Sequence, residues 1–226
     1  LGDLRLHMTQ YVYPPVTPPT DNCTVLILGA GASYGSNLHI KPPVMGKFIK
    51  EGKEKVTFDY TRLWEFLNSI GYSVRDIENG KPNLEELYTI LQTISSGLWY
   101  GNENELLADI GNKFWKCPPG DYLESFIVEV LSISSNEALI SPCNYHDTLV
   151  KGLKIGDSII SFNYDLLIDI SLSKNSNWSE LGGYGFPCWE LWCDEPGCRY
   201  NTSNINKITL LKPHGSLNWR LKDETT

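Results

Sequence analysis

The chain has 226 residues and a formal net charge of −8, and its apolar and charged fractions are those of a globular protein that buries its own core. The acidic charge argues against a nucleic-acid binder held by phosphate contacts, and no apolar run reaches the length of a membrane span. Six scattered cysteines in so long a chain predict reduced thiols instead of a disulfide scaffold, and hence a cytoplasmic location.

The first elements along the chain are a proline-rich lead-in, a strand and a glycine-rich turn. Residues 11–20 contain four prolines, which lack backbone N–H donors, so we expect residues 1–20 to be extended ahead of a domain over residues 21–226. Residues 24–28 form a short, continuous apolar run, which predicts a fully buried strand. The run leads directly into the turn GAGASYG over residues 29–35.

The next part of the chain, from about residue 83 to residue 152, has the 3.6-residue periodicity of helices. It opens with a capping-box pattern, in which Asn83 is followed three residues later by Glu86. Amphipathic runs continue the pattern at residues 103–116, 121–135 and 145–154. We predict a block of several helices whose buried side chains include Leu87, Leu91, Phe126 and Val130.

Two more apolar runs follow the helical block. The first, residues 157–163, opens directly onto a helical segment, and the second begins at Lys207. Short apolar strands with helices between them predict an α/β fold with a Rossmann-like parallel sheet. The helical block then becomes an insertion between the first and second strands.

The glycine turn is suited to holding a phosphate, because glycines let a ligand approach the backbone closely. Gly29 and Gly31 occupy the first two glycine positions of the dinucleotide-binding fingerprint, whereas the third glycine, Gly35, comes one place late. No acidic residue ends a strand about twenty positions later, and no Gly-Lys-Ser/Thr follows as in a P-loop. A tight strand-to-helix turn without a ligand is the alternative.

Polar side chains follow the second and third strands. Asn163 and Asp165 come at the end of the second strand, and His214 comes at the end of the third. Each has a structural alternative, since Asn and Asp often cap helices and a histidine can bond a loop carbonyl. Ligands of open α/β sheets bind at the carboxyl ends of the strands, so we expect Gly31, Asn163 and His214 around one cleft.

The segments GAGAS, FNYD and KPHGSLNW, in this order on strands between residues 24 and 219, resemble the sirtuin superfamily. The closer similarity is to the sirtuin-like, NAD-hydrolysing domains of bacterial antiphage defence. The resemblance implies that the glycine turn binds the pyrophosphate and adenosine side of NAD, through Gly29, Ala30, Gly31 and Ser33. It implies that Asp165 holds the nicotinamide carboxamide and that Asn163 and His214 are catalytic.

The sequence departs from the protein-deacylating sirtuins at two places. Residues 37–48 contain no Asp-Phe-Arg run, and the two CxxC pairs of the structural zinc site are missing. Three cysteines spaced by four residues precede His214 instead, and without CxxC geometry we expect no metal (Cys188, Cys193 and Cys198). Both departures favour hydrolysis of NAD over deacylation.

The sequence therefore predicts an NAD glycohydrolase that releases nicotinamide and ADP-ribose. An NAD-dependent deacylase, an ADP-ribosyltransferase and a non-catalytic sensor of NAD or ADP-ribose remain as alternatives. Sirtuin-like domains continue with further strands after the histidine strand, so the resemblance implies that strands beyond residue 226 complete the sheet. A sensor domain or partner protein beyond that residue and a homo-oligomer are left open, and no membrane or nucleic acid partner is expected.

Overall fold

A parallel sheet of three strands forms the base of the molecule. The computed structural model describes residues 23–99, 119–185 and 208–219. Within them the strand order is β1-β2-β3, and both neighbouring pairs are parallel (β1, Val25–Leu28; β2, Ser158–Ser161; β3, Thr209–Leu211). The predicted mixed α/β fold with a parallel sheet is thereby confirmed, while its assignment as Rossmann-like stays a prediction.

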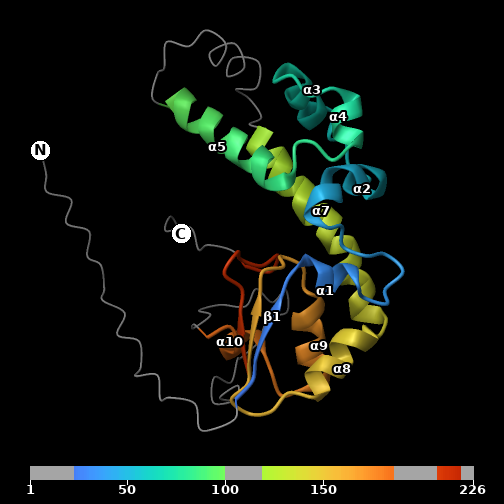
Figure 1. Cartoon of the computed structure of the whole chain (residues 1–226), viewed down its shortest axis with the longest axis vertical. Coiled ribbons are helices and arrows are strands. Elements are labelled where there is room, and N and C mark those ends of the chain that lie inside the picture. Colours follow the sequence, from blue (N-terminus) through green and yellow to red (C-terminus); the bar gives the residue numbers. More distant parts are fainter. Residues whose placement is uncertain (1–22, 100–118, 186–207, 220–226) are drawn as a thin grey trace, which may run out of the picture.

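One face of the sheet packs on helices. Leu26, Ile159 and Leu210 are in register across the strands and join one apolar core with side chains of helices α8 (Asn144–Lys151) and α9 (Leu167–Asn175). Figure 1 shows both helices on the same side of the strands.

The other face of β1 is not covered by the described residues. Val25 is 58% exposed and Ile27 is 69% exposed. The prediction of a fully buried first strand is therefore wrong over this part of the chain. The physical reason is that the helices described next to β1 pack on one face only, so its side chains alternate between core and surface.

A helical block stands over the carboxyl ends of the strands (Figure 1). After the short helix α1 (Ala30–Tyr34) and the 3-10 turn Met45–Lys47, the chain forms helices that share one core (α2, Phe48–Lys55; α3, Thr61–Ser69; α4, Val74–Glu78; α5, Leu84–Trp99; α7, Pro119–Ile140). The core includes the predicted side chains, all of which are buried (Leu87, Leu91, Phe126 and Val130). The part of the predicted block over residues 100–118 lies outside the described residues.

The boundaries of the block differ from those predicted. Its core begins at Phe48, well before the expected start near residue 83, because α2, α3 and α4 pack on α5 and α7. Helix α8, which was predicted to belong to the block, packs on α9 and the sheet instead. The predicted capping box at the start of α5 is confirmed, with the Glu86 N–H donating to Asn83 at 2.9 Å and the Asn83 N–H donating to Glu86 at 3.0 Å.

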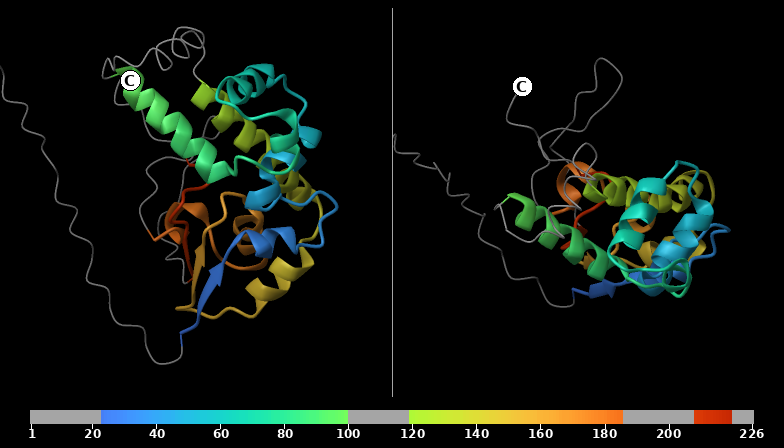
Figure 2. Two further views of the ribbon diagram at one scale, coloured as in Figure 1. Left: turned by 45° about the horizontal axis from the view of Figure 1, so that its top comes forward. Right: turned by 90° about the horizontal axis from the view of Figure 1, so that it is seen from above.

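Helix α7 joins the two parts of the molecule. Its Phe126 and Val130 are buried in the helical core, whereas its Ala138 packs with Leu38 and Leu167 beside the sheet. Figure 1 shows this helix running from the block down towards α8 and α9, and the left view of Figure 2 shows the same course after a 45° turn. No helix among the described residues is both long enough and apolar enough to pass through a bilayer. The short helix α10 (Glu180–Gly183) completes the described elements before β3.

Candidate functional site

A cavity of about 740 Å³ lies between the carboxyl ends of the strands and the helical block. We call it the cleft. Five of the residues predicted to form a site line it (Ala30, Ser33, Asn163, Asp165 and His214). Gly29 contacts one of these residues directly, since its carbonyl oxygen accepts a hydrogen bond from Asn163, and Gly31 lies two residues further along the same turn. The structure thus brings Asn163 and His214 to one cleft, whereas Gly29 and Gly31 belong to the adjoining turn and do not line it.

Asn163 connects the end of β2 to the glycine turn. The residue is 8% exposed, and Nδ2 donates to the Gly29 carbonyl at 3.0 Å and to the Ser33 Oγ at 2.8 Å. A carbonyl can only accept, so this contact fixes which end of the amide faces the turn. Both amide hydrogens are then used, and Oδ1 has no hydrogen-bond partner among the described residues. The oxygen is left as an acceptor at the cleft.

Asp165 is buried beneath the cleft. Burial raises the pKa of its carboxyl, while hydrogen bonds from the Ser33 hydroxyl and the Leu167 N–H act in the opposite direction. The Leu167 N–H donates to Oδ1 at 3.1 Å, so Asp165 bonds the first residue of α9, although the N-cap of this helix is Leu166, which makes no side-chain cap bond. This bond does not remove Asp165 from the cleft, and Asn163, Ser33 and Asp165 form one hydrogen-bonded chain.

His214 lies in a tight turn just after β3. Gly215 has φ of +92°, a conformation that favours glycine, and its N–H donates to the Lys212 carbonyl at 2.9 Å. The imidazole is exposed and packs against Phe162 with ring centroids 5.3 Å apart and against Tyr164 at 6.0 Å. No hydrogen bond joins the ring to another described residue. Its nitrogens are therefore free to act on a ligand in the cleft, and the predicted loop-carbonyl alternative is not found.

A buried lysine holds the turn that carries His214. The Lys212 Nζ donates to the Asp165 carbonyl at 2.7 Å, to the Ser216 Oγ at 2.7 Å and to the Asp169 carboxylate at 3.1 Å. Asp169 also accepts from the Tyr184 hydroxyl at 2.5 Å. Both side chains of the ion pair are buried. Removing Lys212 alone would leave a buried carboxylate unpaired, which costs about 3–5 kcal/mol. The sequence analysis did not predict this role.

The two glycines of the turn are not required by the fold. A Cβ atom built on Gly29 or Gly31 would meet no other atom within 4 Å. Neither residue has a positive φ; Gly29 has φ of −121° and ψ of −177°, and Gly31 lies inside helix α1. Gly31 in a helix is less stable than alanine would be. The fold therefore does not require glycine at either position. Glycine at both positions does keep the space beside the turn free of side chains.

The helical block supplies the opposite wall of the cleft, which sequence reasoning missed. Glu85 and Tyr88 come from α5, and Glu124 comes from α7. These three residues lie on the polar faces of amphipathic helices. A helical pattern in the sequence does not indicate which other part of the chain such a polar face lies against. Among the described residues that line the cleft there are three carboxylates and neither lysine nor arginine.

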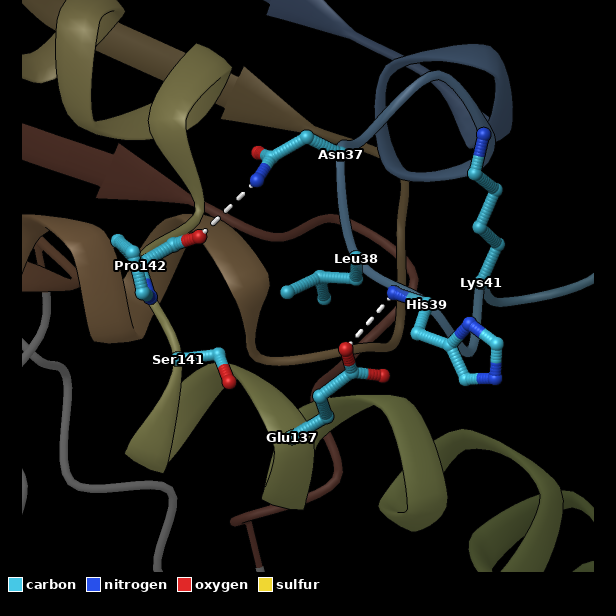
Figure 3. A pocket seen from close by; sticks show the side chains of 7 residues that line it. All are labelled: Asn37, Leu38, His39, Lys41, Glu137, Ser141 and Pro142. Carbon is cyan, nitrogen blue, oxygen red and sulfur yellow. Dashed lines mark hydrogen bonds between the residues drawn. The ribbon is translucent and has the colours of Figure 1, made fainter.

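A second, open cavity of about 540 Å³ lies beside the loop that follows the glycine turn (Figure 3). Glu137 of α7 accepts hydrogen bonds from the backbone N–H groups of His39 and Ile40, both at 2.7 Å. Asn37 donates to the Pro142 carbonyl at 3.1 Å. These side chains tie the loop to α7 and so place the two following prolines, which line the cleft.

No cluster of three or more His, Cys, Asp or Glu side chains that could hold a metal ion occurs among the described residues. Cys188, Cys193 and Cys198 lie outside them. No model of a protein family matches the sequence, and no curated protein matches it. The function must therefore be argued from the cleft and from the motifs that line it.

Proposed function

We propose that the protein is a sirtuin-like NAD glycohydrolase. The observation that carries the proposal is the amide of Asn163, which bonds the glycine turn and leaves its oxygen at a cleft that His214 also lines. This arrangement sets a turn with room for a phosphate beside an acceptor and a titratable base. The resemblance of the three motifs to the sirtuin superfamily supports the same conclusion.

The reaction needs one bond broken and one bond made. The bond between C1′ of the ribose and N1 of nicotinamide breaks, and its electron pair goes to N1, which loses its positive charge. A water oxygen bonds to C1′ and releases a proton, so NAD and water give ADP-ribose, nicotinamide and H⁺. Such a step passes through an oxocarbenium-like state and depends mainly on positioning and electrostatics.

The residues of the cleft fit these tasks. The glycine turn with Ala30 and Ser33 receives the pyrophosphate side of NAD, and the Asn163 Oδ1 accepts a hydrogen bond from a ribose hydroxyl or from the attacking water. His214 takes the proton that the water releases. The resemblance to the sirtuin superfamily assigns the nicotinamide carboxamide to Asp165, whose pKa is raised by burial.

In this proposal the enzyme consumes cellular NAD as an effector of antiphage defence, in the cytoplasm where NAD is found. Deacylation, ADP-ribosyl transfer and non-catalytic sensing are the competing functions. Sensing is disfavoured by His214, because binding alone does not need an unpaired imidazole at the cleft.

The test is to incubate the full-length protein with NAD, with and without an acyl-lysine peptide and an acceptor protein. The proposal expects equal amounts of nicotinamide and ADP-ribose in every mixture. Nicotinamide that appears only with the peptide would identify a deacylase, and label on the acceptor protein would identify a transferase. Binding of NAD without any product would leave a sensor.

A further inference from the structure

The two walls of the cleft differ in charge. The strand ends contribute neutral polar groups and the buried carboxyl of Asp165, whereas the helical wall contributes the exposed carboxylates of Glu85 and Glu124. No lysine or arginine lines the described part of the cleft, although the ligand proposed above carries a pyrophosphate. A negative phosphate is therefore disfavoured near the helical wall, and a positive group is favoured there.

Aromatic rings accompany these carboxylates. Tyr88 of α5 and Tyr164, which follows β2, both line the cleft and are 45% and 38% exposed. Burial, together with the nearby Tyr88 and Glu85, raises the pKa of the Tyr164 hydroxyl, which agrees with the closeness of these three side chains. Partly exposed tyrosine faces beside a carboxylate are a suitable surface for a cation.

Asn163 adds a hydrogen-bond acceptor to the same cleft. The residue is more than nine-tenths buried and lines the cleft, and its Oδ1 has no hydrogen-bond partner among the described residues. This oxygen is open to the cleft, since it is not one of the fully buried polar side-chain atoms that lack a partner. A ligand group that donates a hydrogen bond next to Tyr164 therefore fits this place.

We propose that Glu85, Tyr88 and Tyr164 form a subsite that selects a cationic aromatic ring, and that this ring is the nicotinamide pyridinium of NAD⁺. The identification of the ring rests on the function proposed above. Glu124 on α7 adds negative charge to the same wall. The subsite directs the pyridinium to the helical wall and the pyrophosphate to the glycine turn, so it determines the orientation of the substrate.

The same charge favours release of the product. Cleavage neutralises the nicotinamide ring, so the attraction of the carboxylates and of the ring faces for it is lost when the bond breaks. The subsite therefore binds the substrate ring more tightly than the product ring. It also disfavours NADH, whose nicotinamide ring lacks the positive charge.

The experiment compares 1-methylnicotinamide, which is a pyridinium cation because its ring nitrogen is methylated, with neutral nicotinamide, which has the same ring. Their dissociation constants are measured by calorimetry for the wild-type, full-length protein and for Glu85→Gln. The wild type should bind the cation about tenfold more tightly, and Glu85→Gln should reduce this ratio several-fold. Glu65→Gln, at an exposed glutamate of α3 outside the cleft, is the matched control and should leave the ratio unchanged.

A second pair of variants tests the aromatic part of the subsite. Tyr88→Leu should reduce the preference for the cation about three-fold to tenfold, whereas Tyr88→Phe should retain it, because the ring face carries the interaction. Equal binding of the two ring compounds by the wild type would overturn the inference. So would a preference that survives both Glu85→Gln and Tyr88→Leu in proteins with native circular dichroism spectra.

NAD cleavage is measured in the same preparations, so that the two proposals fail separately. Cleavage of NAD without a preference for the cation would contradict the subsite and leave the glycohydrolase standing. A preference for the cation without cleavage would support a cation-selecting wall and contradict the glycohydrolase. For the enzyme itself, Glu85→Gln should raise KM for NAD⁺ several-fold with little change in kcat.

Discussion

Replacing Gly31 tests whether the turn is built for a ligand or for the fold. Gly31 lies inside helix α1, has no positive φ, and an added Cβ would meet no atom within 4 Å. Alanine is more favourable than glycine in a helix by about 0.5–1 kcal/mol. Gly31→Ala should therefore raise the free energy of unfolding by that amount and Tm by about 1–4 °C in a chain of this size.

The same substitution should weaken NAD binding, and Gly31→Val should abolish it, because a side chain there fills the space into which the pyrophosphate comes. Calorimetric titration with NAD and thermal melting are measured on the same samples. Gly46→Ala is the control, since an added Cβ there also meets nothing and the residue lies in the 3-10 turn Met45–Lys47, outside the glycine turn. Wild-type affinity in Gly31→Val would refute the assignment of the turn to the phosphates.

Three further outcomes are expected. His214→Ala should lower kcat about 10²–10⁴-fold while NAD affinity changes much less, and an unchanged rate would show that the histidine is structural. Gly52→Ala should lower the free energy of unfolding by about 1–2 kcal/mol in denaturant titrations, because its Cβ would lie 2.7 Å from Phe126 in the helical core; no loss would mean that α2 and α7 pack less closely. Burial lowers the pKa of His146, so the unfolded state binds its proton more readily and stability should fall as the pH drops below about 6.5. This loss, followed by melting between pH 7.5 and 5, should disappear in a folded His146→Gln variant.

Local signals in the sequence predicted the elements and one end of the site. The three strands and the capping box of Asn83 and Glu86 follow from patterns within a few residues. Strand topology then brings Asn163 and His214 to one edge, since the carboxyl ends of parallel strands lie together. Helix α3 also has an apolar face that its sequence pattern indicates, but this helix was not among those predicted.

Tertiary contacts decide what the sequence could not predict. Whether Val25 and Ile27 are buried depends on what packs on the second face of the sheet, which a strand pattern does not encode. Glu85 is a solvent-face residue by its helical pattern, and it reaches the cleft only because α5 lies over the strand ends. Lys212 belongs to an apolar strand end, and its burial depends on Asp169 arriving from α9.

The most direct test of the account is the amount of nicotinamide released per NAD consumed by the full-length protein, measured by chromatography beside Asn163→Ala. We predict one nicotinamide and one ADP-ribose for each NAD lost, with the rate reduced about 10²-fold or more in the variant, because the amide both holds the turn and offers its oxygen to the cleft. NAD that stays intact at concentrations that saturate its binding would contradict the account. So would cleavage at the wild-type rate in Asn163→Ala.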